Sequence, residues 1–246
     1  MEIFWELHKD LSREGPGNEA STHKALAMAK SLPTKVRVLD LGCGPGAQTI
    51  SLAKVLNGDI IALDLHEPFL EQLKTRAQEE GLSSRIHARK ADMAALEFEP
   101  ASFDLIWSEG AIYNMGFKRG LDEWRRYLKP GGYIAVSELC WLRKDPPEEL
   151  AAYWASDYPA MKDIAANLAI IAGLGYELVG HFTLPQECWR DEYYRPLGKR
   201  IAALRVAHSG DEEALSVLDL CQQEIDLYER YSGYFGYEFF VMKFLA

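Results

Sequence analysis

The chain has 246 residues, 48% of them hydrophobic, which is enough to bury a core without disulfides or a structural metal. Its formal net charge of −10 and the lack of any long lysine or arginine run argue against a nucleic-acid surface. The four cysteines form no C-x-x-C pair, no run is apolar enough to span a membrane, and the first residues lack a signal-peptide pattern, so we expect a soluble, cytoplasmic protein without a metal site.

From about residue 36 onward, apolar runs of strand length alternate with segments of helical period. Strands are expected at 35–41, 58–65, 84–92, 103–110 and 132–139. Helices are expected at 47–56 and 67–81, and a third from residue 120 to a turn formed by Pro130, Gly131 and Gly132. This alternation predicts a parallel sheet covered by helices.

Beyond residue 139 the pattern changes. Residues 163–184 read as a helix, a Gly-x-Gly break and a sixth strand, and residues 233–245 read as an aromatic C-terminal strand. The stretches 1–34, 141–160 and 185–233 are additions that we expect to form a helical cap. The expected fold is therefore α/β: a Rossmann-like three-layer sandwich of one domain (1–246), with a core at 36–140 and a seven-stranded, mostly parallel sheet whose C-terminal strand is antiparallel.

The stretch VLDLGCGPGAQT, residues 38–49, places three glycines directly after the first predicted strand. Ligands of open parallel sheets bind beyond the carboxyl ends of the strands, where this turn would lie. Gly42, Gly44 and Gly46 would let the backbone approach a ligand, and the following helix start offers free N–H groups. Asp64 ends the second strand, where an acid can accept hydrogen bonds from two ribose hydroxyls. A ligand that contains a nucleoside is expected.

Two kinds of nucleoside cofactor fit this pattern. The dinucleotide fingerprint G-x-G-x-x-G/A is met from Gly42 to Ala47, and Tyr158 and Lys162 form the Tyr-x-x-x-Lys of short-chain dehydrogenases. Pro159 disfavours the continuous helix that such a pair requires. Asp40 would repel a pyrophosphate and attract a sulfonium or ammonium group. An NAD(P)-dependent oxidoreductase stays as an alternative, as does a non-catalytic cofactor-binding protein.

Five linked motifs resemble the class I S-adenosylmethionine-dependent methyltransferases. They are VLDLGCGPG, IIALDL, KADM, FDLIWSEGAIYNM and YLKPGGYIAVSEL, in the family's order over residues 36–140. Within that class the chain is similar to bacterial small-molecule enzymes of the methyltransferase type 11 group, related to those that act on quinones, sterols and natural products. The resemblance implies S-adenosylmethionine as cofactor and methyl transfer to a small-molecule acceptor.

The resemblance also implies a set of cofactor-binding positions: Asp40, Gly42, Cys43, Gly44, Asp64, Leu65, Asp92, Met93, Glu109 and Gly110. Asp40 is expected below the amino group of the methionine part, Asp64 on the ribose and Leu65 on the adenine face. Asp92 and Glu109 also have simpler interpretations, as a helix cap and a solvated loop acid.

The catalytic residue is left open, because in-line displacement at a sulfonium needs mainly positioning, and a base only when the acceptor carries a proton at attack. Candidates for it are Glu109, Tyr113 and His181, although a histidine such as His181 is more often a strand-face residue than a base. Further residues that could contact the acceptor are Asn114, Glu138, Trp141, Trp189 and Tyr193. The stretch CWRDEYYRP would be cap packing or an aromatic wall for an apolar acceptor.

The acceptor is expected to be neutral or weakly cationic, with neither nucleic acid nor membrane lipid as a partner, and the protein to be a monomer or homodimer. The sequence SEGA after the fourth strand departs from the Asn/Asp-Pro-Pro-Tyr pattern of enzymes that methylate nucleobase or glutamine amino groups. The stretch SREGPGNEASTHKAL, with Gly15-Pro16-Gly17, fits either the start of an N-terminal helix or a flap that closes over the cofactor.

Overall fold

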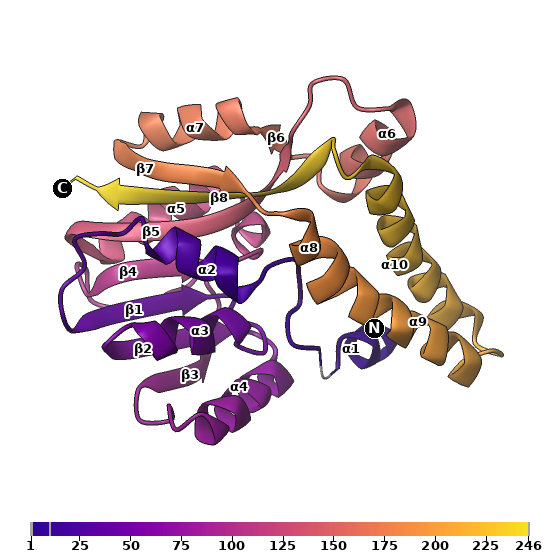
Figure 1. Ribbon diagram of the computed structural model, residues 1–246, viewed down its shortest axis with the longest axis horizontal. Coiled ribbons are helices and arrows are strands. Elements are labelled where there is room, and N and C mark those ends of the chain that lie inside the picture. Colours follow the sequence, from indigo (N-terminus) through magenta and orange to yellow (C-terminus); the bar gives the residue numbers. More distant parts are fainter. Residues whose placement is uncertain (1, 10, 246) are drawn as a thin grey trace.

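The computed structural model describes residues 2–9 and 11–245 and is built on one mixed sheet (Figure 1). Its main strands run in the order β3-β2-β1-β4-β5-β8-β7, and the short β6 (Lys162–Asp163) pairs with β5. The pairings of β8 with β5 and β7 are antiparallel and the other pairings are parallel, so the predicted mostly parallel sheet is confirmed. The strand bounds are β1 Val36–Leu41, β2 Gly58–Asp64, β3 Ile86–Lys90, β4 Phe103–Ser108, β5 Leu128–Trp141, β7 Tyr176–Thr183 and β8 Phe235–Phe244.

Helices cover both faces of the sheet, as the expected three-layer sandwich requires. On one face lie α2 (Glu19–Leu26), α3 (Ala47–Val55) and α4 (Glu67–Glu79), and on the other α5 (Phe117–Trp124) and α7 (Ile164–Gly173). Alternate residues of each strand point to opposite faces, so Val38 packs in the first core cluster and Leu39 in the second. The near-continuous apolar strands are those of a sheet buried on both sides.

Apart from α2, which covers a face of the sheet, the helices of the additions gather beyond one end of the strands. Figure 1 shows α1 (Glu2–His8) beside α9 (Arg195–Ala207) and α10 (Glu212–Tyr231), with α8 (Gln186–Trp189) leading into them and α6 (Glu148–Asp157) above α10. The Arg200 side chain joins α9 to α1, because its Nε donates to the carbonyl of Leu7 at 2.6 Å. The first helix is thus fastened to the late insertion.

The predicted turn at Pro130–Gly132 was wrong. A 3-10 turn (Arg125–Tyr127) ends the helical segment, and β5 begins at Leu128, so these residues lie inside the strand. The pairing with β4 skips there, from Phe103↔Leu128 to Leu105↔Tyr133, and Gly131 has φ +77°. The Pro-Gly-Gly stretch therefore forms a bulge, which a left-handed glycine permits.

None of the helices within residues 2–9 and 11–245 combines the length and the apolar character that a membrane crossing needs.

Candidate active site

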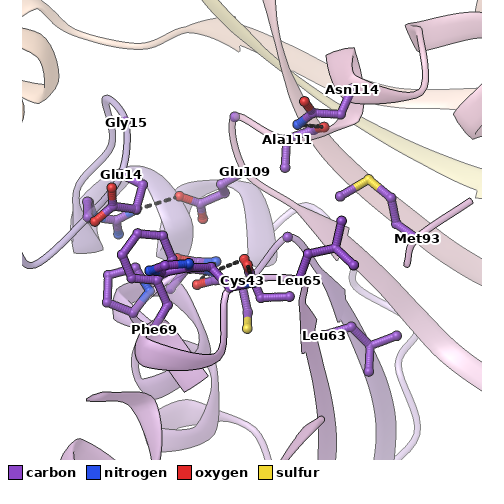
Figure 2. A pocket seen from close by; sticks show the side chains of 18 of the residues that line it. Glu14, Gly15, Cys43, Leu63, Leu65, Phe69, Met93, Glu109, Ala111 and Asn114 are labelled. Carbon is purple, nitrogen blue, oxygen red and sulfur yellow. Dashed lines mark hydrogen bonds and ion pairs between the residues drawn. The ribbon is translucent and has the colours of Figure 1, made fainter. Parts of the chain in front are cut away.

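A cavity of about 610 Å³ lies beyond the carboxyl ends of β1, β2 and β4 (Figure 2). All the predicted cofactor-binding residues except Asp40 line it: Gly42, Cys43, Gly44, Asp64, Leu65, Asp92, Met93, Glu109 and Gly110. The cavity is where the topology of an open parallel sheet places a ligand. In Figure 2, Glu14, Gly15 and Glu109 lie on one side of it, and Ala111, Asn114 and Met93 on another.

The glycine loop, residues 42–46, exposes backbone atoms to the cavity where its glycines carry no side chain. Gly42 has φ +70°, and its N–H donates to the carbonyl of Leu63 at 2.9 Å. A Cβ at this position would lie 2.4 Å from the Cβ of Ala111, so only glycine fits. Gly46, with φ +89°, then begins α3, and a Cβ there would lie 2.2 Å from Leu73 Cδ1. Neither position leaves room for a larger residue.

Asp64 is held by two backbone donors at the end of β2. The N–H of Gly44 donates to its Oδ2 at 2.9 Å, and the N–H of His66 donates to its Oδ1 at 2.8 Å. Each carboxylate oxygen keeps a lone pair for another donor. The carboxylate is thereby oriented before a ligand arrives, which suits a pair of vicinal hydroxyls.

Aromatic rings close the cavity beside Leu65, whose side chain is 60% exposed. Trp5 of α1 stacks on His66, with ring centroids 3.7 Å apart and an interplanar angle of 7°, and Phe69 packs edge-on to both. Across from them, Asp92 accepts a hydrogen bond from the N–H of Ala94 at 2.8 Å and so caps its own turn. A flat ring fits between such apolar walls.

Asp40 lies beneath the loop instead of in the cavity. It is fully buried; Thr49 Oγ1 donates to its Oδ2 at 2.5 Å, and Gln48 Nε2 lies 3.4 Å away. Within the described residues its Oδ1 has no hydrogen-bond partner. Burial raises the pKa of Asp40 to about 7. Its link to the cavity is Gln48, which lines it and donates to the carbonyl of Cys43 at 3.0 Å.

The raised pKa of Asp40 has a measurable effect on stability. Between the ordinary value of 3.8 and about 7, the folded protein keeps a proton that the unfolded chain releases, so the free energy of unfolding falls as pH rises through this window. Relative to Asp40→Asn, the wild type should lose up to about 1.4 kcal/mol per pH unit between pH 5 and pH 7. Urea denaturation at pH 5, 6 and 7 measures the difference, and parallel curves would contradict the assignment.

The N-terminal segment forms one wall of the cavity and is fastened by Glu109. This carboxylate accepts from Arg13 Nη1 at 2.8 Å, Thr22 Oγ1 at 2.7 Å and Trp107 Nε1 at 2.9 Å. The Arg13 and Glu109 side chains are 8% and 5% exposed. Glu109 is therefore neither a solvated acid nor a free base. Asn18 accepts a hydrogen bond from the N–H of Ser21 and caps α2. The predicted stretch therefore contains a helix start, and the residues just before it, Glu14 to Pro16, line the cavity.

Glu14, which lies over the glycine loop and lines the cavity, was not among the predicted site residues. Its side-chain Cγ would be 3.5 Å from a Cβ at Gly44, and its Oε2 is 2.6 Å from His8 Nδ1. The other oxygen is buried without a hydrogen-bond partner in the described parts of the chain, and burial raises the pKa of Glu14. Arg76 Nη1 donates to the carbonyls of Ser12 and Pro45, which joins the segment to the loop. The nearby Gly15-Pro16-Gly17 was the available signal.

Of the predicted catalytic candidates, Glu109 and Tyr113 line the cavity, as does Asn114. His181 lies on β7 outside the lining residues, with its Nδ1 2.5 Å from Glu238 Oε1. The dehydrogenase pair is also separated: Tyr158 follows the end of α6, and Lys162 lies in β6.

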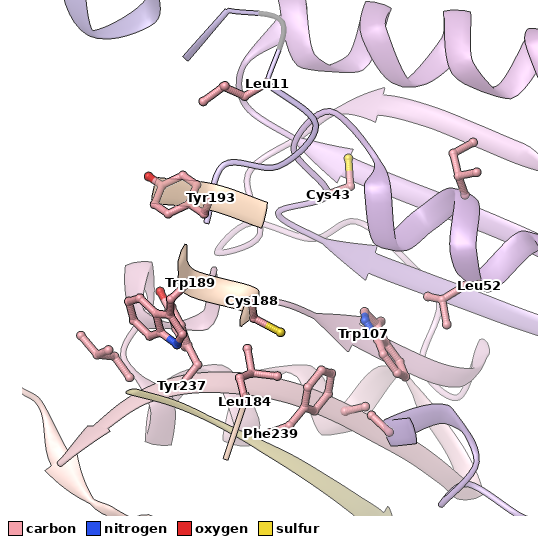
Figure 3. Packing of buried hydrophobic residues seen from close by; sticks show 14 of the residues in the cluster. Leu11, Cys43, Leu52, Trp107, Leu184, Cys188, Trp189, Tyr193, Tyr237 and Phe239 are labelled. Atoms are coloured by element: carbon pink, nitrogen blue, oxygen red, sulfur yellow. The ribbon is translucent and has the colours of Figure 1, made fainter. Parts of the chain in front are cut away.

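The aromatic stretch 188–196 is packing of the cap. Trp189 is 2% exposed and stacks on Tyr228 and Tyr237 at centroid distances of 4.7 and 5.3 Å. Figure 3 shows Trp189 beside Tyr237 and Cys188, with Tyr193 between them and Leu11 of the N-terminal segment. None of these residues is part of the cavity lining, nor are Glu138 and Trp141.

Comparison with known proteins gives the class. Residues 38–132 match a family described as "Methyltransferase domain". The chain is 26% identical, over 85% of its length and 76% of the relative, to 27-O-demethylrifamycin SV methyltransferase of Amycolatopsis mediterranei. It is 28% identical to sterol 24-C-methyltransferase erg-4 of Neurospora crassa, over 70% of this chain, and spans about half of that relative (48%). A methyltransferase from Geobacter sulfurreducens, solved with S-adenosyl-L-homocysteine, shares the fold at a TM-score of 0.84 and 24% identity over 98% of this chain and 97% of that one.

The match of residues 38–132 to the methyltransferase family and the methyltransferase names of these relatives support the class that the sequence motifs predicted, a class I S-adenosylmethionine-dependent methyltransferase with S-adenosylmethionine as its methyl donor.

Proposed function

We propose that this chain transfers a methyl group from S-adenosylmethionine to a small-molecule acceptor by in-line displacement. The proposal depends on one observation: the glycine loop and Asp64 line the same cavity as Tyr113 and Asn114. The cavity offers room for a nucleoside and for an acceptor beside it. When bound, the cofactor supplies a methyl group on a positively charged sulfur.

One carboxylate oxygen of Glu14, above the glycine loop, has no hydrogen-bond partner in the described residues and could bind the amino acid part of this cofactor. We assign the α-ammonium to Glu14 Oε1, which is buried without a partner in the described residues, instead of to Asp40. Arg13, whose Nη1 is held by Glu109, lines the same wall and would pair with the α-carboxylate. Because Glu14 and Arg13 belong to the N-terminal segment, cofactor binding and ordering of this segment would stabilise each other.

Asp64→Ala should weaken cofactor binding by roughly 1.5 to 3 kcal/mol, because charge-assisted hydrogen bonds to the ribose are lost. Asp59→Ala is the matched control, since this acid lies near the other end of β2 with a side chain 47% exposed. Calorimetric titration with S-adenosylhomocysteine measures both variants. Equal affinities for the two would remove Asp64 from the ribose site.

The active site is proposed to act by positioning and by excluding water. Glu109 has its carboxylate occupied by three donors, and burial raises the pKa of Tyr113, so neither is a ready base at neutral pH. Such a site suits an acceptor that attacks without first losing a proton. The two curated relatives compared above have natural-product and sterol names, which supports a small acceptor, and the acidic chain argues against nucleic acid.

The proposed activity is tested by screening quinones, phenols, amines and carboxylic acids for formation of S-adenosylhomocysteine. We expect turnover with members of one of these classes, dependent on an intact Asp64. Cofactor binding without turnover across all four classes would favour the non-catalytic binding protein.

A further inference from the structure

The N-terminal helix α1 depends on the late insertion for its position. It has seven residues, Glu2–His8, whereas isolated helices shorter than about 12–15 residues are only marginally stable in water. Ile3 and Leu7 are buried in the first core cluster, and the helix contacts α9 and α10. Figure 1 shows α1 beside these two helices. Packing against the insertion, and not helix propensity, therefore fixes where α1 lies.

Arg200 of α9 caps the C-terminal end of α1. The carbonyls of the last turn have no partner within a helix, and a cation beside them is favourable. Arg200 Nε donates to the carbonyl of Leu7 at 2.6 Å, and its Nη2 donates to the carbonyl of Glu6. His208, which follows α9, adds a second link, because its Nε2 lies 3.1 Å from Glu6 Oε2. None of these four residues lines the cavity.

Two side chains of α1 reach the cofactor cavity or a residue of its wall. Trp5 lines the cavity, and its indole stacks on His66, which directly follows Leu65, the residue expected on the adenine face. His8 Nδ1 lies 2.6 Å from Glu14 Oε2. The other oxygen of Glu14 is the one that we assigned to the α-ammonium of the cofactor. One short helix thus supports both the nucleoside end and the amino acid end of the site.

The indole of Trp5 suits the nucleoside part of the ligand. His66 covers one of its faces at an interplanar angle of 7°, and Phe69 packs at its edge, yet Trp5 remains 38% exposed. Part of the ring surface is therefore open at the cavity wall, where it can pack against a purine. This surface comes from α1 and not from the sheet, so it is in place only while α1 is docked.

We infer that α1 is part of the cofactor site and that Arg200 is the positioning residue that holds it there. Trp5 contacts the nucleoside part of the cofactor, and His8 orients Glu14 toward the amino acid part. The inference rests on the proposed function and goes beyond it, because it ties cofactor affinity to a residue of the late insertion that lies outside the cavity lining.

Trp5 is tested with two ligands that share a nucleoside: S-adenosylhomocysteine, and 5′-methylthioadenosine, which lacks the amino acid part. Trp5→Ala should weaken the binding of both about tenfold, because stacking on the shared base is lost. Trp5→Phe keeps a ring and should bind both within about threefold of the wild type. Glu14→Gln should weaken the binding of S-adenosylhomocysteine alone. Calorimetric titration measures the affinities, and a Trp5→Ala variant that binds both ligands as the wild type does would overturn the contact.

Arg200→Gln should weaken the binding of S-adenosylhomocysteine about tenfold, because the last turn of α1 loses its donors. Arg200→Lys keeps a cation at this helix end and should recover part of the affinity. Arg205→Gln is the matched control: this arginine also belongs to α9, but it pairs with Asp219 of α10 at 2.6 Å, and its variant should bind as the wild type does.

A double-mutant cycle separates positioning from a general loss of stability. If Arg200 acts through Trp5, Arg200→Gln should lower the affinity for 5′-methylthioadenosine in the wild type but cause no further loss in Trp5→Ala. Equal losses in both backgrounds, or an Arg200→Gln variant that is less stable in urea yet binds both ligands normally, would overturn the positioning role and leave the methyltransferase proposal standing. Failure of the wild type to bind S-adenosylhomocysteine would contradict that proposal itself.

Discussion

Gly42→Ala should reduce the affinity for S-adenosylmethionine about a hundredfold or more. A side chain at φ +70° costs about 1–2 kcal/mol, and its Cβ would lie 2.4 Å from the Cβ of Ala111 and 3.2 Å from Met93 Cε. Both neighbours line the cavity, so relief of the clash must move the wall that holds the cofactor. Calorimetric titration measures the affinity, and urea denaturation measures the accompanying loss of stability.

Gly81→Ala separates the cost of the left-handed backbone conformation from the cost of the clash with the cavity wall. Gly81 has φ +68°, nearly the same backbone conformation, but a Cβ there would meet nothing within 4 Å, and the residue lies outside the cavity lining. Its alanine variant should show a similar conformational cost and unchanged cofactor affinity. If both variants bind the cofactor as the wild type does, the glycine loop has been assigned to the wrong role.

Trp189→Ala should lower the free energy of unfolding by about 3–5 kcal/mol, the usual range for removing a buried aromatic side chain. The indole is 2% exposed and packs between Tyr228 and Tyr237, with Phe235 at its edge. At a temperature where the variant is folded, we expect cofactor affinity to be retained.

The control for Trp189→Ala is Val206→Ala on α9, where the side chain is 78% exposed and a change within about 0.5 kcal/mol is expected. A Trp189→Ala variant as stable as the wild type but with a raised acceptor Michaelis constant would support the aromatic wall instead of cap packing.

The cofactor side of the cavity could be predicted because its parts are local in sequence. The glycine loop and Asp92 follow strands and Asp64 ends one, and parallel strands bring their carboxyl ends to one edge. The alternation of strands and helices predicted the mostly parallel sheet, whereas the order of its strands came only from the structure.

The positions of several side chains in and around the site could not be predicted, because they depend on tertiary packing. Asp40 belongs to the same motif as Gly42, yet its carboxylate turns toward Thr49 and away from the cavity. Glu14 and Trp5 reach the site because α1 docks on the late insertion, a contact between opposite ends of the chain. Glu138 and Tyr158 likewise meet only after folding. No period or spacing marks such contacts.

The central claim is that this cavity holds S-adenosylmethionine, and calorimetric titration of the wild-type protein tests it most directly. Titrations with S-adenosylmethionine, S-adenosylhomocysteine, NAD and NADP in the same buffer give four curves to compare. The account predicts saturable binding of one S-adenosylmethionine and one S-adenosylhomocysteine per chain, in competition with each other, and no heat from either dinucleotide. Saturable binding of NAD or NADP, with no heat from S-adenosylmethionine, would contradict it.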